Sequence, residues 1–318
     1  MTAPDDASRE TPAFARLLLR VALGLAGRIP SSLAHAAAAA AATLEYRLNP
    51  ARREAVHANL REIARAGHPL LRHPADRERC ARSVFRAYHR HLAEFLAQGR
   101  LTPGAWDARF RFEGTEHLYR AAAAGRGAVI AGSHLGNWEL AGLALARLGF
   151  RVHVVTGIQW NPLLHGAVRE LKERSGIEVS TPEDGFTPLI ATLRQGGLVV
   201  LLVDGDVYTR GLTAPFFGRA VSFPVGPALL ARRAGAPLLH AHAAREGGGH
   251  RVVFDGADLP DRALSLGRDL ARLTARVAAA QERNIAAQVG EWCIFRPFFG
   301  DAGAPAVAGD AGAPADAA

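Results

Sequence analysis

The stretch of residues 128–140 reads Ala128-Val129-Ile130-Ala131-Gly132-Ser133-His134-Leu135-Gly136-Asn137-Trp138-Glu139-Leu140. It begins with an apolar run typical of a buried strand and passes through small residues typical of a turn. A helix then starts near Gly136 or Asn137. His134 therefore follows the carboxyl end of a strand, which is where open α/β folds bind their ligands.

The same alternation of short apolar runs and longer helical patterns continues towards the carboxyl end of the chain. Strands are predicted at residues 128–131, 152–156, 177–180, 198–203, 238–243 and 252–254. Helices are predicted at residues 140–148, 163–174, 187–195, 225–234 and 264–288. This pattern predicts an α/β fold with a mostly parallel central sheet flanked by helices.

Four regions are expected along the chain. Residues 1–12 are polar and form a flexible N-terminus, and residues 13–100 form a helical, membrane-associating region. Residues 101–300 form the α/β domain, and the tail 301–318 is rich in Ala, Gly and Pro and is expected to be disordered.

The membrane expectation rests on two apolar runs near the N-terminus. The first, residues 13–29, is interrupted by Arg16, Arg20 and Arg28, which leaves too little apolar length to span a bilayer. The second run, residues 33–44, is rich in alanine and is also short. An in-plane or hairpin anchor is the preferred interpretation, whether inserted in the membrane or lying on it. The alternative is an amphipathic helix that packs on the core.

The charge of the chain favours an acidic partner. The formal net charge is +8, and the hydrophobic fraction of 49% is enough to bury a large core. A basic protein is attracted to anionic lipid, to an acidic carrier protein or to nucleic acid. Nucleic acid is disfavoured because the basic residues are not interleaved with aromatic ones. Cys80 and Cys293 lie far apart and match no metal or redox spacing, so no metal site is expected from them.

His134 and Glu139 are the candidate catalytic residues. A histidine is well suited to take a proton from a hydroxyl near neutral pH, and a carboxylate behind it fixes its tautomer. One helical turn is expected to bring Glu139 back towards the imidazole. Together these groups suit base-catalysed acyl transfer to an alcohol. The alternative is structural, because glutamate in a first helical turn is also favoured by the helix dipole and by capping.

Asp204 and Asp206 follow another apolar strand and form a second candidate group. They could orient an acceptor hydroxyl, or one of them could be a second carboxylate near His134. They could instead bind a divalent metal with a nucleotide-sugar, or close an Asx-type turn. Arg210 and Arg219 flank a Pro-Phe-Phe-Gly segment, where they could contact a phosphate or a lipid head group, or remain solvated. Four phenylalanines, at 216, 217, 298 and 299, could line an acyl tunnel or a membrane-facing lip, but packing in the core is the preferred interpretation.

These motifs together resemble a known family. The string from Gly132 to Glu139 resembles the His-x4-Asp/Glu box of glycerolipid acyltransferases. In its Gly-Asn-Trp-Glu form it resembles the bacterial lipid A biosynthesis (lauroyl/myristoyl) acyltransferase family, which includes phosphatidylinositol mannoside acyltransferases. Later blocks resemble that family in the same order over roughly residues 15–300, namely Asn161-Pro162, Asp204-Gly205-Asp206, Pro215-Phe216-Phe217-Gly218 and Gly290-Glu291-Trp292-Cys293-Ile294-Phe295-Arg296-Pro297.

The resemblance implies a reaction and a set of site residues. His134 would deprotonate an acceptor hydroxyl while Glu139 holds it, and the alkoxide would attack a thioester on acyl carrier protein or coenzyme A. The thioester would be a co-substrate, and no further cofactor is implied. The implied substrate-binding residues are Asn137, Asn161, Asp204, Asp206, Arg210 and Arg219.

The resemblance also implies a location, at the cytoplasmic face of the bacterial inner membrane, where the protein would be peripheral or monotopic. One departure concerns the acceptor. Family members often carry Arg-Pro just before the Asn-Pro block, where this chain has Thr156-Gly157-Ile158-Gln159-Trp160. The acceptor, lipid or glycolipid, therefore stays open.

Two other classes of function remain as alternatives from the sequence. One is a metal-dependent glycosyltransferase that uses Asp204 and Asp206. The other is a membrane-associated lipid-binding protein without turnover.

Overall fold

The structure is a computed structural model that describes residues 29–157, 162–205 and 211–300. A seven-stranded sheet forms its centre, in the order β1-β9-β8-β2-β5-β3-β4. Its strands are β1 (Phe110–Glu113), β2 (Ala128–Gly132), β3 (Val152–Val155), β4 (Ile177–Ser180), β5 (Leu198–Leu202), β8 (Leu238–Glu246) and β9 (Gly249–Asp258). All neighbouring pairs in this sheet are parallel except β8 and β9, which are antiparallel. The predicted α/β fold with a mostly parallel sheet is confirmed.

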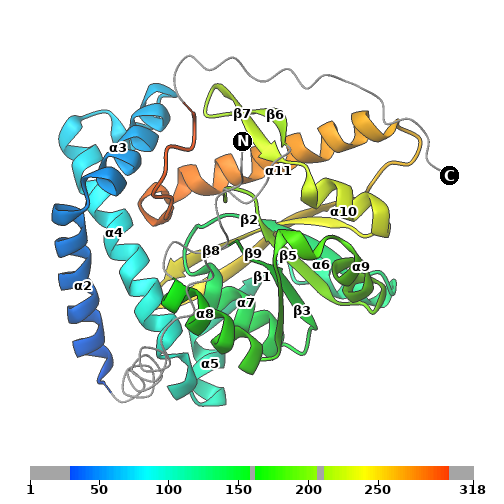
Figure 1. Cartoon of the computed structure of the whole chain (residues 1–318), viewed down its shortest axis with the longest axis horizontal. Coiled ribbons are helices and arrows are strands. Elements are labelled where there is room, and N and C mark those ends of the chain that lie inside the picture. Colours follow the sequence, from blue (N-terminus) through cyan, green and yellow to red (C-terminus); the bar gives the residue numbers. More distant parts are fainter. Residues whose placement is uncertain (1–28, 158–161, 206–210, 301–318) are drawn as a thin grey trace, which may run out of the picture.

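Helices cover both faces of the sheet (Figure 1). They are α5 (Pro103–Arg109), α6 (Glu116–Ala123), α7 (Trp138–Arg147), α8 (Pro162–Arg174), α9 (Thr187–Arg194), α10 (Gly226–Ala234) and α11 (Leu266–Ala287). Short 3₁₀ turns lie at η1 (Pro69–Leu71), η2 (Gln98–Arg100), η3 (Pro182–Asp184) and η4 (Val289–Glu291). The helices predicted within the α/β region are confirmed, with small shifts at their ends.

Strand β2 shows how the two faces are filled. Successive side chains of a strand point to opposite faces. Val129 and Ala131 join the core that contains α9, α10 and α11, whereas Ala128 and Ile130 join the core that contains α6, α7 and α8. Every residue of β2 is buried, which explains its uninterrupted apolar sequence.

Three strands lie outside the sequence prediction. Strand β1 is short and alternates aromatic with charged residues, so its apolar signal is weak. Strands β6 (Gly211–Phe216) and β7 (Arg219–Pro224) form a separate antiparallel hairpin. Its turn places Phe217 and Gly218 at positive φ, as a tight two-residue hairpin turn requires. The four phenylalanines at 216, 217, 298 and 299 are buried together, so their expected packing role is confirmed.

The N-terminal helices α2 (Ser31–Leu48), α3 (Pro50–Arg65) and α4 (Pro74–Leu96) lie together beside the sheet (Figure 1). Asn49 caps α3 by accepting a hydrogen bond from the Arg52 N–H, and Pro50 occupies the first helical position. Helix α4 reaches both faces of the sheet, because Phe85 joins one core and Phe95 the other.

The predicted apolar run at residues 33–44 lies within α2. The helix buries Ala42 and Tyr46 but leaves Leu33, Leu44 and Leu48 exposed. Over the described ranges, no helix combines the length and the apolar character needed to cross a bilayer. Of the first apolar run, predicted at residues 13–29, all but the last residue lie outside the described residues.

Candidate active site

The register of the sheet brings His134 and Asp204 together. Strands β2 and β5 are parallel neighbours in which Gly132 pairs with Leu202. His134 and Asp204 each lie two residues beyond that pair. The two side chains meet at the carboxyl edge of the sheet, where the His134 Nδ1 is 2.8 Å from the Asp204 Oδ1.

Asp204 is buried, and both of its carboxylate oxygens accept hydrogen bonds. Its carboxylate accepts from the backbone N–H of His134 and from the indole N–H of Trp292, whose Nε1 is 2.8 Å from Oδ2. The Arg296 guanidinium donates to its backbone carbonyl. Burial alone raises the pKa of Asp204, but His134 and Trp292 outweigh burial and hold that pKa below its usual value. Asp204 is therefore ionised at neutral pH.

This environment determines which nitrogen of His134 carries a proton. An ionised carboxylate only accepts hydrogen bonds, so Nδ1 must donate to Asp204. In a neutral imidazole, Nε2 is then the nitrogen with a free lone pair. The imidazole is 28% exposed, and Nε2 has no hydrogen bond to any residue in the described ranges. The arrangement is that of a general base with a carboxylate behind it.

A segment near the C-terminus lines the other side of the His134 turn. We call residues 291–296 the closing segment. The Cys293 N–H donates to the His134 carbonyl, and the Gly136 N–H donates to the Glu291 carbonyl. Leu135 and Trp292 thereby form an antiparallel bridge. The closing segment holds the turn by its backbone and holds Asp204 through its indole.

A glycine is required at position 136 by its backbone conformation and by its close approach to Ala243 of β8. Its φ of +61° lies in the left-handed region, and a Cβ there would come within 2.2 Å of the Ala243 carbonyl oxygen. Gly136 thus forms the turn between His134 and the start of α7.

The structure corrects the role expected for Glu139. The carboxylate behind His134 is Asp204, and Glu139 instead forms an ion pair with Lys172 of α8, at 2.8 Å between Oε2 and Nζ. The expectation was that the first turn of the helix after His134 would carry the Glu139 carboxylate back towards the imidazole. His134 precedes α7 and is separated from it by the turn at Gly136, so helical spacing does not bring them together.

Asn137 also differs from the expected substrate contact. It is 1% exposed, and its Oδ1 accepts from the Leu140 N–H, which caps α7. Its amide donates to the Glu94 carboxylate and to the His91 carbonyl of α4. Both amide hydrogens are used inside the protein, so in this structure Asn137 positions the turn.

The remaining predicted residues divide into two groups. Arg219, at the start of β7, forms an ion pair with Glu62 of α3 at 2.9 Å and does not join the His134 pair. Asn161, Asp206 and Arg210 lie outside the described residues.

Among the described residues, no group of His, Cys, Asp or Glu side chains is arranged to hold a metal ion. Both oxygens of Asp204 are already bonded to His134 and Trp292, which disfavours the metal-dependent alternative for that residue.

Two residues of the site were assigned no role from the sequence. Trp292 fixes Asp204, and Lys172 neutralises Glu139. Lys172 is the only lysine of the chain and is 7% exposed. A single lysine in an arginine-rich chain is a signal that could have pointed to a specific role.

Comparisons with known proteins agree with these motifs. The family model described as bacterial lipid A biosynthesis acyltransferase matches residues 6–300. A phosphatidylinositol mannoside acyltransferase of Mycobacterium tuberculosis (strain CDC 1551 / Oshkosh) is 34% identical over 190 residues. That match spans 58% of this chain and 58% of the relative's length. A protein of the same name from Mycolicibacterium smegmatis is 30% identical over 243 residues, which span 74% of this chain and 77% of that relative.

Proposed function

Since the chain belongs to the bacterial lipid A biosynthesis acyltransferase family, we propose that it transfers a fatty acyl group from an acyl thioester to a hydroxyl of a lipid or glycolipid. The observation that carries the proposal is the His134–Asp204 pair, which leaves Nε2 of His134 as a base at the carboxyl edge of the sheet.

The proposed reaction begins when Nε2 of His134 takes the proton of the acceptor hydroxyl. The resulting alkoxide attacks the carbonyl carbon of the thioester and forms the new C–O bond. The C–S bond then breaks, and the thiolate leaves and takes a proton from the imidazolium. Asp204 stabilises the imidazolium between these two steps. General-base assistance of this kind contributes about 10²- to 10⁴-fold in rate.

Glu139 takes a positioning role in this proposal. Its ion pair with Lys172 joins the first turn of α7 to the last turn of α8. Helix α8 begins directly after Asn161, which is one of the predicted substrate-binding residues. We propose that Glu139 orients α8, and through it the acceptor side of the site, while His134 is oriented by Asp204.

Charge and similarity narrow the proposed substrates. Coenzyme A and acyl carrier protein are both anionic, and the net charge of +8 favours either as the thioester carrier. The similar mycobacterial proteins are named for acylation of phosphatidylinositol mannosides. We therefore propose a mannosylated phosphoinositide, whose free hydroxyls suit the reaction, as the acceptor.

A lipid acceptor requires contact with a membrane. Leu33, Leu44 and Leu48 are 60%, 58% and 71% exposed on α2, where they provide apolar side chains for the interfacial zone of a bilayer. We propose peripheral association through this helix, at the cytoplasmic face, where thioester carriers are available.

The proposal is tested with purified protein, radiolabelled acyl-coenzyme A or acyl carrier protein thioester, and vesicles that contain a mannosylated phosphatidylinositol. The wild type is expected to form an acylated glycolipid, and His134→Ala is expected to lose about 10²-fold or more of the rate. The matched control is His117→Ala, because His117 lies on α6 and pairs with Glu116 away from Asp204. Full transfer by a folded His134→Ala variant would contradict the mechanism. Binding of vesicles without turnover, even by the wild type with both carriers, would favour the lipid-binding alternative.

A further inference from the structure

We propose that Glu291, which Arg90 and His91 of α4 hold in place, is a positioning residue for the His134–Asp204 pair. The effect on the rate of acyl transfer rests on the proposed function. The effect on the position of the closing segment does not. Glu291 touches neither His134 nor Asp204 with its side chain, so it acts through the closing segment that it begins.

The closing segment contacts both members of the catalytic pair and the turn that follows His134. The Glu291 carbonyl accepts from the Gly136 N–H, and the Cys293 N–H donates to the His134 carbonyl at 2.8 Å. Between them, the Trp292 indole donates to Asp204. A shift of this segment would therefore move the His134 turn and the Asp204 carboxylate together.

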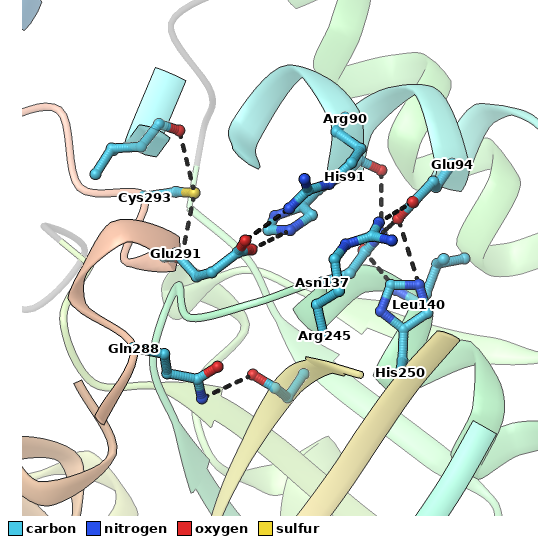
Figure 2. A network of polar contacts seen from close by, with 12 residues as sticks. Arg90, His91, Glu94, Asn137, Leu140, Arg245, His250, Gln288, Glu291 and Cys293 are labelled. Carbon is cyan, nitrogen blue, oxygen red and sulfur yellow. Dashed lines mark hydrogen bonds and ion pairs between the residues drawn. The ribbon is translucent and has the colours of Figure 1, made fainter. Parts of the chain in front are cut away.

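Helix α4 holds the start of the closing segment by an ion-pair cluster (Figure 2). The Glu291 carboxylate accepts from the Arg90 guanidinium at 2.6 Å and from the His91 Nε2 at 2.9 Å. Two charge-assisted hydrogen bonds from adjacent residues of one helix restrict a carboxylate in both direction and distance.

The protonation states of this cluster follow from burial together with the hydrogen bonds and charges that each group meets. Burial alone raises the pKa of Glu291, but His91 and Arg90 outweigh it and hold that pKa below its usual value. Burial also lowers the pKa of His91. Glu291 is therefore an anion, and a neutral His91 must donate from Nε2. Within the described part of the chain, Nδ1 of His91 has no hydrogen-bond partner.

One turn further along, α4 holds the other end of the same loop. Glu94 accepts from the Asn137 amide and is paired with Arg245 and His250 of the sheet (Figure 2). Asn137 in turn caps α7. Helix α4 thus fixes the His134 turn from two sides, through Asn137 and through Glu291.

Glu291 is the better of the two positions for a test. The Glu94 side chain is 5% exposed and joins several elements, so its loss endangers the fold. The Glu291 side chain is 19% exposed and pairs only with Arg90 and His91 among the described residues, so its loss should mainly affect the position of the closing segment. Replacement by glutamine keeps its shape and removes its charge.

The cluster is also connected to His134 by ring contacts. The His91 and Trp138 rings pack edge to face with their centroids 6.1 Å apart, and the centroids of the Trp138 and His134 rings are 4.9 Å apart. A change in the hydrogen bond of His91 to Glu291 would therefore reach His134 by packing as well as through the backbone.

The experiment compares the wild type with Glu291→Gln by ¹⁵N NMR and by steady-state kinetics. The chain has four tryptophans, so the indole N–H signal of Trp292 is assigned by its loss in Trp292→Phe. The expected result is a displaced Trp292 signal, a kcat lowered about 10-fold or more, and a KM within about 2-fold, because misplacement of reacting groups by ~1 Å can lower rates about 10²-fold. The matched control is Glu113→Gln, which removes a more exposed pair with Arg251 and should change neither quantity.

An unchanged Trp292 signal together with an unchanged kcat would overturn the proposal. A lower kcat/KM with an unchanged kcat would also overturn it, since that result indicates that Glu291 contacts the substrate. If Glu291→Gln does not fold, Arg90→Gln tests the same cluster with the His91 bond retained, and the same outcomes apply. If the wild type shows no acyl transfer, the proposed function fails, but the Trp292 signal still decides whether Glu291 positions Asp204.

Discussion

His134 and Asp204 occupy matching positions on neighbouring parallel strands, each two residues beyond the Gly132–Leu202 pair, with Nδ1 and Oδ1 2.8 Å apart. The pair thus depends on the register of β2 against β5. The indole of Trp292 completes it from a distant part of the chain.

The first prediction concerns that indole. Trp292→Phe keeps an aromatic ring in the cluster with Phe216 and Phe298 but removes the donor to Asp204. A buried carboxylate that loses one donor is destabilised by about 1–3 kcal/mol. We expect a lower free energy of unfolding in urea and a lower kcat. Phe298→Leu, which disturbs the cluster but not the hydrogen bond, serves as the control and should retain more of the kcat.

The second prediction concerns the ion pair between the half-buried Glu139 and the buried Lys172. Lys172→Met leaves Glu139 without its cation. Removal of one partner from a fully buried pair lowers stability by about 3–5 kcal/mol, and because the Glu139 side chain is 18% exposed we expect a loss of about 3 kcal/mol or less. Chemical denaturation of the variant measures this loss. The double variant Glu139→Gln/Lys172→Met should recover much of it, because no unpaired charge remains. If the double variant were as unstable as Lys172→Met, the destabilisation would come from packing and not from charge.

The third prediction concerns stability in acid. Burial alone raises the pKa of Glu94, but His250 and Arg245 outweigh it and hold that pKa well below its usual range. A carboxyl with a depressed folded-state pKa contributes stability that is present above its unfolded pKa, about 4.3, and is lost as pH falls further. The free energy of unfolding should therefore decline below about pH 4.3. Glu94→Gln should be less stable at pH 7, and its free energy of unfolding should decline less steeply in acid. An equally steep decline would show that Glu94 is not the cause of the acid sensitivity.

The fourth prediction concerns membrane contact. Leu44→Glu places a charge on the exposed apolar side of α2 and should weaken vesicle binding in a flotation assay. Leu259→Glu is the control, because Leu259 is similarly exposed, at 62%, in the loop after β9. Equal binding by both variants would indicate that α2 is not the contact surface.

The parts of the site that depend on local sequence could be predicted. The strand before His134 and the helix after it follow from apolar runs, a turn and the Asn137 cap. Asp204 could be placed at a strand end for the same reason. Its position next to His134 could not be derived, because the pairing of β2 with β5 is a long-range property that periodicity does not encode.

Glu139 and Asn137 show where local reasoning fails. Spacing suggested that the first turn of α7 carries Glu139 back to His134, yet Gly136 turns the chain before α7 and Glu139 pairs with Lys172 instead. Asn137 lies in a motif with the appearance of a binding loop, but its partners Glu94 and His91 come from a distant helix. Such partners become visible only when the packing of α4 against the sheet is known.

The central claim is that His134 and Asp204 act as one catalytic unit, and a double-mutant cycle tests it most directly. Acyl transfer to the glycolipid is measured for the wild type, His134→Ala, Asp204→Asn and the double variant, each checked for folding. Residues that act as a unit give strongly non-additive losses. The double variant is therefore expected to be no slower than His134→Ala alone, with losses of about 10²-fold or more. Retained transfer in His134→Ala, or fully additive losses in the double variant, would contradict the claim.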